Sequence, residues 1–216
     1  MTAKPVAWVI NLDRCAENWA RIQRDWCDTF DLRRISAVDA VAAGITGQAA
    51  CRQSHLTMLH TLAAGPPAAY HIVLEDDVYK TAEWEILWPQ LQQFLEERRT
   101  DWDLMSLDPL LGWDSPVLQK FTPAVLQTSA FRSTGFLVYN GNSLMKLIDI
   151  AGSRSGGAID MLMCRSPSLT KVVPRSLMVR QYTDKPSTIS GKPSTSFYNR
   201  WYDDTEKILA AFNKDV

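Results

Sequence analysis

Short apolar runs alternate along the chain with stretches in which apolar residues recur every three or four positions. The run at 6–12 (VAWVINL) predicts a buried strand, and Trp19, Ile22, Trp26 and Phe30 follow at helical spacing. Further strands are expected at 34–38, 70–74, 104–107, 134–139, 169–173 and 177–181. Further apolar stripes predict helices at 51–62, 84–95, 143–150 and 203–212.

Turn-forming residues separate these elements. Gly65-Pro66-Pro67 ends one predicted helix, while Asn142 is placed to cap the helix at 143–150, with Gly152 as its stop. Residues 184–198 are rich in Ser, Thr, Pro, Lys and Gly, so we expect a mobile flap at about 183–200. Strands alternating with helices indicate an α/β fold with a mainly parallel central sheet flanked by helices. No linker divides the chain, so residues 1–216 are interpreted as a single domain.

Composition narrows the class of protein. Hydrophobic residues make up 46% of the 216 positions, enough to bury a core and to exclude disorder as the main state. The formal net charge is -1, so no global positive field would hold nucleic acid or an anionic membrane. No apolar run approaches the roughly 18 residues of a membrane span, which leaves peripheral membrane contact open. Residues 1–12 do not resemble a signal peptide, and the four Cys form no C-x-x-C pair. A reducing, cytoplasmic setting is therefore expected.

The most informative chemical feature is the acidic motif Glu75-Asp76-Asp77, which directly follows the apolar strand at 70–74. Ligands of open α/β sheets bind beyond the carboxyl ends of the strands. Three adjacent carboxylates repel one another unless a cation is near, and oxygen-only ligands favour Mg²⁺ or Mn²⁺. Such an ion could bridge the phosphates of a nucleotide diphosphate. The alternative is an acidic turn, solvated or capping a helix.

Other polar residues offer weaker indications. Asp160 follows two glycines that allow a ligand to approach closely, so its carboxylate could act as a general base; the alternative is a helix N-cap. Asp108 ends the strand at 104–107 and is either a second such carboxylate or a turn residue. Arg14, after the first strand, could pair with phosphate or lie on the surface.

Two groups of residues extend this set of candidates. Arg52, Ser54 and His55 share the start of a helix, where backbone N–H groups favour anions, although His55 also fits a core position. The predicted flap contains four residues that could fold over a diphosphate: Lys185, Ser187, Ser190 and Lys192. The alternative is that they belong to a solvated loop. The sequence contains no P-loop, no G-x-G-x-x-G turn and no G-x-S-x-G elbow, and its three His form no zinc pattern.

Several segments together resemble glycosyltransferase family 25, the group of lipooligosaccharide and collagen galactosyltransferases. The similar segments are 9–14 (VINLDR), 35–40 (ISAVDA), 50–55 (ACRQSH), 72–78 (IVLEDDV), 102–107 (WDLMSL), 134–147, 159–160 (ID) and 179–181 (VRQ), with Ser187 and Ile189 after them. They occur in the family's order and span about residues 6–190. The acidic motif takes the place of the family's Asp-x-Asp signature.

The resemblance implies a GT-A-type fold and an inverting transfer of a hexose, with galactose and glucose as first expectations. The donor is expected to be a nucleotide diphosphate sugar, UDP-linked, and the acceptor a hydroxyl of a glycan or glycoconjugate. Residues implied to line the nucleotide pocket or approach the donor are Ile10, Asn11, Leu12, Arg14, Asp39, Arg52 and Ser54. Residues implied to hold Mn²⁺ or Mg²⁺ or to contact the donor ribose are Asp77, Glu75 and Asp76.

Asp160 is implied to be the general base, with Asp108 as the second choice, by analogy with inverting glycoside hydrolysis. The chain departs from many metal-dependent GT-A enzymes because its last His, His71, precedes the acidic motif and leaves no late His for the metal. Acceptor recognition is expected from loops such as 109–128, with Trp113, Trp201 or Tyr202 stacking on sugar rings or packing in the core. Two other functions stay open: a metal-dependent hydrolase of nucleotide sugars or phosphate esters, and a non-catalytic glycan-binding module.

Overall fold

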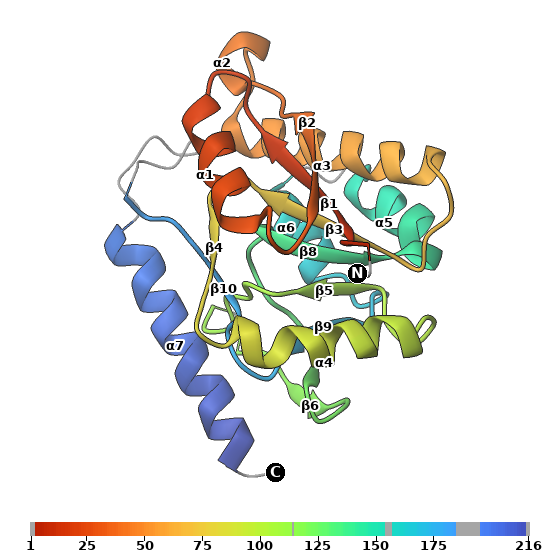
Figure 1. Ribbon diagram of the computed structural model, residues 1–216, viewed down its shortest axis with the longest axis vertical. Helices are drawn as coiled ribbons and strands as arrows, with labels where there is room; N and C mark the ends of the chain where they lie inside the picture. The colour runs from red at the N-terminus through yellow and green to blue at the C-terminus, as the bar shows by residue number, and fades with distance from the viewer. Residues whose placement is uncertain (1–2, 114, 154–156, 185–194, 215–216) are drawn as a thin grey trace.

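A computed structural model describes residues 3–113, 115–153, 157–184 and 195–214, and Figure 1 shows its central sheet between layers of helices. In spatial order the eight strands of the sheet are β2 (Asp31–Ser36), β1 (Val6–Asn11), β3 (Tyr70–Glu75), β8 (Phe136–Asn140), β5 (Leu104–Ser106), β9 (Lys171–Pro174), β7 (Val125–Thr128) and β6 (Leu118–Lys120). A second, two-stranded antiparallel sheet joins β4 (Val78–Lys80) to β10 (Val179–Gln181).

Most strands of the large sheet run in one direction. β1 pairs in parallel with β2 and β3, and β5 pairs in parallel with β9. β8 lies antiparallel between β3 and β5, and β7 lies antiparallel between β9 and β6. The fold is therefore a mixed α/β single domain with a large, mostly parallel central sheet, as the alternating sequence pattern predicts.

Helices cover both faces of the sheet. Their bounds are α1 (Ala16–Trp26), α2 (Ala40–Ala43), α3 (Gly47–Ala64), α4 (Trp84–Glu97), α5 (Leu144–Ala151), α6 (Ile159–Cys164) and α7 (Thr195–Lys214), with a 3₁₀ turn at Gly141–Ser143. Buried residues of α1 and α4 join one core cluster, and those of α3, α5 and α6 join the other together with Leu209 of α7. Tyr202 of α7 forms a small third cluster with Leu110 and Leu177. Among the described helices, none combines the length and the apolar run needed to cross a bilayer.

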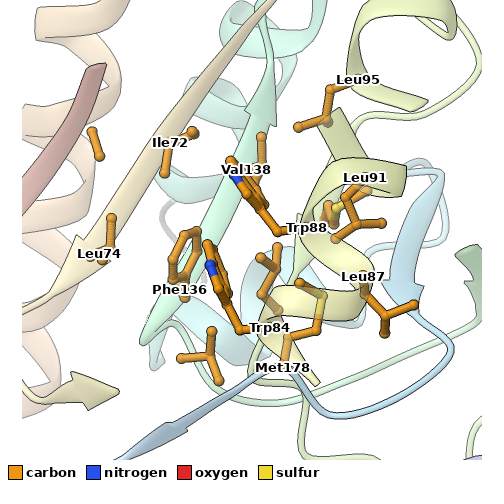
Figure 2. Close-up of a cluster of buried hydrophobic side chains, with 14 of the residues drawn as sticks. Ile72, Leu74, Trp84, Leu87, Trp88, Leu91, Leu95, Phe136, Val138 and Met178 are labelled. Carbon is orange, nitrogen blue, oxygen red and sulfur yellow. The ribbon is translucent and has the colours of Figure 1, made fainter. Parts of the chain in front are cut away.

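Alternation along β3 divides its side chains between the two clusters. Ile72 and Leu74 face α1 and α4, whereas Val73 faces α3 and α5. Figure 2 shows the first of these clusters, where the apolar face of α4 packs on β3 and β8. Trp84 stacks on Trp88 with ring centroids 4.7 Å apart and meets Trp26 of α1 edge-on. Several of the eight tryptophans thus serve the core rather than a binding surface.

Two local predictions need correction. Asn142 does not cap α5: its backbone N–H donates to the side chain of Asn140, 2.9 Å away, and Ser143 takes the cap position without a side-chain hydrogen bond. Gly152 does end α5. The predicted loop 109–128 contains the β6–β7 hairpin, because β7 finds a pairing partner in β9 that lies far away in sequence.

The flap predicted at 183–200 overlaps the start of a helix. Residues 185–194 lie outside the described residues, but α7 already begins at Thr195, so the segment 195–200 is helical rather than part of a loop. The helix expected at 203–212 is correspondingly longer at its start. Tyr202 on this helix is fully buried, and its hydroxyl accepts a hydrogen bond from the Gln181 backbone N–H at 3.0 Å. That contact joins α7 to the small sheet.

Candidate functional site

A first hollow opens at the carboxyl ends of the parallel strands β1, β2 and β3, where ligands of such sheets bind. Its cavity volume is about 90 Å³, so the hollow is shallow and open to solvent. The predicted donor-site residues that line it are Ile10, Leu12, Arg14, Ser54, Glu75 and Asp76. Apolar atoms from β1 and α2 form much of the wall, and the acidic motif closes one end.

Arg14 and Asp39 meet at the rim of this hollow. The Arg14 Nε donates to Asp39 Oδ2 at 2.6 Å, and both side chains are partly exposed. Asp39 also caps α2 through a hydrogen bond from the Val41 N–H at 2.9 Å. The hydrogen bond from Arg14 is the main reason that the pKa of Asp39 lies below its usual value. Asp39 therefore orients Arg14 and holds α2 beside the hollow without lining the hollow itself.

Asn11 is buried and does not line the hollow. Its amide donates to Asp76 Oδ2 at 2.5 Å and to the Cys15 carbonyl at 3.1 Å, while its carbonyl accepts from Arg34 Nε at 2.6 Å. Burial raises the pKa of Asp76 despite the hydrogen bond from Asn11. Asn11 thus positions an acidic wall residue, whereas the sequence interpretation placed it directly against a nucleotide.

Glu75 lies at the centre of a second group of contacts. His55 Nε2 lies 3.0 Å from Glu75 Oε1, and the Thr134 hydroxyl donates to the same oxygen at 2.7 Å. The Cys51 thiol is 3.9 Å from that oxygen. Burial works to raise the pKa of Glu75, but the hydrogen bond and charge of His55, with Thr134, bring it below its ordinary value. His55, 1% exposed, is therefore a partnered site histidine and not an apolar core residue.

Cys51 belongs to the same group. Its thiol pKa is raised well above its usual value, first by burial and then by the negative charges of Glu75 and Asp160. The thiol is consequently protonated at neutral pH in the absence of a cation. Cys51, His55 and Glu75 together place one sulfur, one nitrogen and one oxygen within 4.8 Å of one another.

Asp77, the last residue of the acidic motif, has a buried carboxylate. Its Oδ1 is buried and has no hydrogen-bond partner among the described residues. Burial first, and then the charges of Glu75, Asp76 and Asp108, raise the pKa of Asp77 well above its usual value. A divalent cation at this oxygen would offset both the desolvation and the repulsion, so the donor set fits a hard cation such as Mn²⁺ or Mg²⁺. The acidic motif is thus more than a solvated turn.

A second hollow of about 300 Å³ adjoins the first, and Cys51 and Glu75 line both. Asp160, in the first turn of α6, lines this hollow together with Trp113 and Tyr198. Burial raises the pKa of Asp160, although its Oδ1 accepts a hydrogen bond from the Met161 N–H at 2.7 Å. Ala158, not Asp160, occupies the N-cap position of α6.

Aromatic residues form the outer part of the second hollow. The rings of Trp113 and Trp201 lie 4.6 Å apart at 32°, and the Arg132 guanidinium lies 4.2 Å from the Trp113 ring. Trp113 keeps 41% of its surface exposed, although Trp201 and Arg132 both pack against its ring. Burial and the charge of Asp77 raise the pKa of Tyr198 to about 12. Tyr202, by contrast, is buried beneath this layer and cannot stack on a sugar.

Asp108 lies beneath the site and not on its surface. The residue is fully buried and accepts hydrogen bonds from Ser133 Oγ, from Ser106 Oγ at 3.2 Å and from the Phe136 N–H at 3.0 Å. Burial raises its pKa to about 7. Gly135 is packed so closely that a Cβ there would lie 2.5 Å from Asp108 Oδ2. Asp108 therefore anchors the segment that carries Thr134, and it lines neither hollow.

Arg52 points away from both hollows. Its guanidinium donates to the carbonyls of Ala151, at 2.7 Å, and Ser153, at the carboxyl end of α5. This position satisfies carbonyls that the helix end leaves open. Lys185 and Ser187, with the other predicted flap residues, lie outside the described part of the chain.

Three residues that line the second hollow were not predicted from the sequence, and each comes from a different part of the chain. Thr134, Gln181 and Tyr198 line the second hollow from the start of β8, from β10 and from α7. Nothing local distinguishes these residues from ordinary strand or helix positions. Cys51 was visible only as part of the segment that resembles the glycosyltransferase family.

No protein-family model matches the chain, and no curated protein matches it. Among solved structures the fold is similar to A197 from STIV, with 8% identity over 83% of this chain and 86% of that chain and a TM-score of 0.47. It is also similar to HddC from Yersinia pseudotuberculosis, with 10% identity over 79% and 68% of the two chains and a TM-score of 0.38. Likeness at this level concerns the arrangement of strands and helices alone, so the functional argument depends on the site.

Proposed function

We propose that the protein is an inverting glycosyltransferase of the GT-A type. It moves a hexose, galactose or glucose, from a UDP-linked donor to a hydroxyl of a glycan or glycoconjugate. One observation carries the proposal: two hollows meet at Glu75, one closed by the acidic motif and the other containing Asp160 and exposed aromatic surface. Transfer between two bound molecules needs this arrangement, with the reacting atoms at the junction.

The first hollow suits the nucleoside diphosphate. A base would pack against the apolar wall formed by Ile10 and Val38, and Arg14 at the rim would pair with an anionic group. Asp77 Oδ1, which is buried without a hydrogen-bond partner among the described residues, would be a ligand for Mn²⁺ or Mg²⁺, with Glu75 as the second candidate ligand. Asp77 itself lines neither hollow, so the ion would have to reach it past Glu75 or Asp76. When bound, the cation neutralises charge that develops on the departing diphosphate.

The second hollow suits the acceptor. Trp113 offers exposed apolar surface for a sugar, and Asp160 is the general base. Asp160 takes the proton of the acceptor hydroxyl while that oxygen bonds to the anomeric carbon and the bond from this carbon to the diphosphate oxygen breaks. Burial raises the pKa of Asp160, which makes its carboxylate a stronger base than an exposed one.

A cytoplasmic location accompanies this proposal, because all four cysteines are free thiols and a reducing compartment preserves them. The acceptor could be a lipopolysaccharide core, a capsular glycan or a cellular or viral glycoprotein. A membrane-linked acceptor would require only peripheral contact of the enzyme with the membrane.

Thermal unfolding with UDP, GDP, CMP and TDP, each with and without Mn²⁺, tests the donor site. A ligand at about 100 times its dissociation constant stabilises the fold by about 2.7 kcal/mol. For a chain of this size that raises Tm by about 2–4 °C per kcal/mol. We expect a rise with UDP that increases with Mn²⁺ and loses its Mn²⁺ increment in Asp77→Asn. No rise with any nucleotide would overturn the proposal.

Incubation with UDP-galactose or UDP-glucose then separates the remaining functions. Sugar transfer to a glycan acceptor is the expected result. Release of free sugar or phosphate that no acceptor increases would indicate a metal-dependent hydrolase instead. Nucleotide-independent binding to glycans, without turnover, would indicate a glycan-binding module.

A further inference from the structure

We propose that Cys51, His55 and Glu75 form a binding site for a thiophilic divalent cation of the zinc class, next to the hard-cation site proposed at Asp77, with which it would share Glu75. The site lies in the wall that the two hollows share. Its three ligand atoms, a sulfur, a nitrogen and an oxygen, lie within 4.8 Å of one another. Zinc coordinates these three atom types at about 2.0–2.3 Å, so a modest inward movement of the side chains completes the site.

The backbone holds these ligands on two regular elements. Cys51 and His55 are four residues apart on α3 and therefore project from one face of the helix. Glu75 is the last residue of β3, whose neighbours β1 and β8 fix it on both sides. Ligands placed on a helix and a strand need little reorganisation when an ion binds.

Two further residues orient the ligands in the way that metal sites require. The Tyr139 hydroxyl lies 3.2 Å from His55 Nδ1, and the Thr134 hydroxyl donates to Glu75 Oε1 at 2.7 Å. When Nε2 coordinates an ion, the ring proton resides on Nδ1, where the Tyr139 oxygen accepts it. Tyr139 is fully buried, so its hydroxyl has little freedom to turn elsewhere. Tyr139 and Thr134 are accordingly positioning residues.

The ligand chemistry selects the class of ion. A thiolate and an imidazole prefer zinc and cobalt to magnesium or manganese. Binding replaces the proton of the Cys51 thiol, which passes to solvent, and joins two negative ligands to a doubly positive ion. The site therefore becomes neutral when occupied. Three protein ligands leave a fourth position toward the hollows for water, as in open zinc sites.

Cobalt binding to the whole protein tests the proposal without nucleotide or turnover. Co²⁺ bound by a thiolate shows a sulfur-to-metal charge-transfer absorption, and Zn²⁺ should displace it at one equivalent. We expect this absorption in the wild type and in Cys27→Ser, which removes an exposed cysteine away from the site. Cys51→Ser should abolish it and weaken zinc binding at least about 100-fold, more than loss of an outer partner does.

A second variant keeps the test decisive if Cys51→Ser folds poorly. Tyr139→Phe retains all three ligands, and we expect zinc binding about 10-fold weaker because His55 loses its orienting partner. His60→Asn, at an exposed position on the same helix, should change nothing. Equal zinc affinity in the wild type and Cys51→Ser, or cobalt binding without the charge-transfer absorption, would overturn the proposal. A failed nucleotide titration would leave this result unaffected, because no step of the test involves a donor sugar.

Discussion

Replacing Asp77 by Asn should make the metal-free protein more stable, although it removes a residue of the proposed active site. Asp77 keeps Oδ1 buried without a partner among the described residues, and three other carboxyl groups act on its charge. The amide side chain that this substitution introduces has nearly the same shape and no charge. The variant therefore removes the desolvation and the repulsion while it leaves the packing unchanged.

The magnitude follows from the cost of burying such a group. The amide leaves a polar atom in the same buried place, so the gain comes from removing the charge, and each unit of pKa shift corresponds to about 1.4 kcal/mol. We expect Asp77→Asn to raise the free energy of unfolding by about 1–3 kcal/mol at pH 8. For a chain of this length, Tm rises by about 2–4 °C per kcal/mol.

The pH dependence fixes the sign of the effect. The pKa of Asp77 is higher in the folded protein than the value of 3.8 expected for the unfolded chain. The stability that a protonated Asp77 contributes is present in full below pH 3.8 and is lost as the pH rises through the raised pKa. The stability difference between the variant and the wild type should therefore be widest at pH 8 and close towards pH 4.

Denaturant unfolding from pH 4 to 8, with and without Mn²⁺, measures this difference. Saturating Mn²⁺ should stabilise the wild type and not the variant, which reverses their order. Asp101→Asn is the matched control, because it changes the net charge equally at an exposed residue whose pKa is lowered by Arg98. A difference that is constant with pH, or a variant less stable than the wild type at pH 8, would refute the reasoning.

Three further variants test other parts of the site. Asp160→Asn should leave the UDP-induced rise in Tm intact and lower the transfer rate by about 10²–10⁴-fold; unchanged turnover would remove its assignment as base. Gly135→Ala should cost about 1–3 kcal/mol in thermal unfolding, because its Cβ would lie 2.5 Å from Asp108 Oδ2, whereas Gly65→Ala meets only ordinary contacts and serves as control. Trp113→Ala should raise the KM for the acceptor and leave that for the donor unchanged; equal effects on both would place Trp113 outside the acceptor subsite.

The sequence by itself determined the elements that have their own periodicity. The short apolar runs predicted β1, β3 and β8 to within a few residues. Apolar residues at helical spacing predicted α1, α3 and α4 with similar accuracy. The position of the acidic motif at the end of β3 also followed from the sequence, because it depends only on where one buried strand stops. Such features are encoded within a dozen neighbouring residues, where spacing alone carries the information.

Tertiary structure decided which side chains meet. Asn11 turns onto Asp76, and Arg52 turns onto the end of α5, although both stand in segments that suggested a donor site. Asp108, at the end of a strand as expected, is buried beneath Gly135 instead of reaching a ligand. In each case the direction of the side chain depends on partners 25 or more residues away, as it does for Asp108 and Ser133.

The same reason explains the junction of the two hollows. Glu75 receives His55 from α3 and Thr134 from the segment before β8, and these partners are 20 and 59 residues away in the sequence. The antiparallel insertion of β8 between β3 and β5 is what brings Thr134 to that position. Local patterns specify which residues are polar and near a strand end, but only the packing of distant elements selects the pairs that form a site.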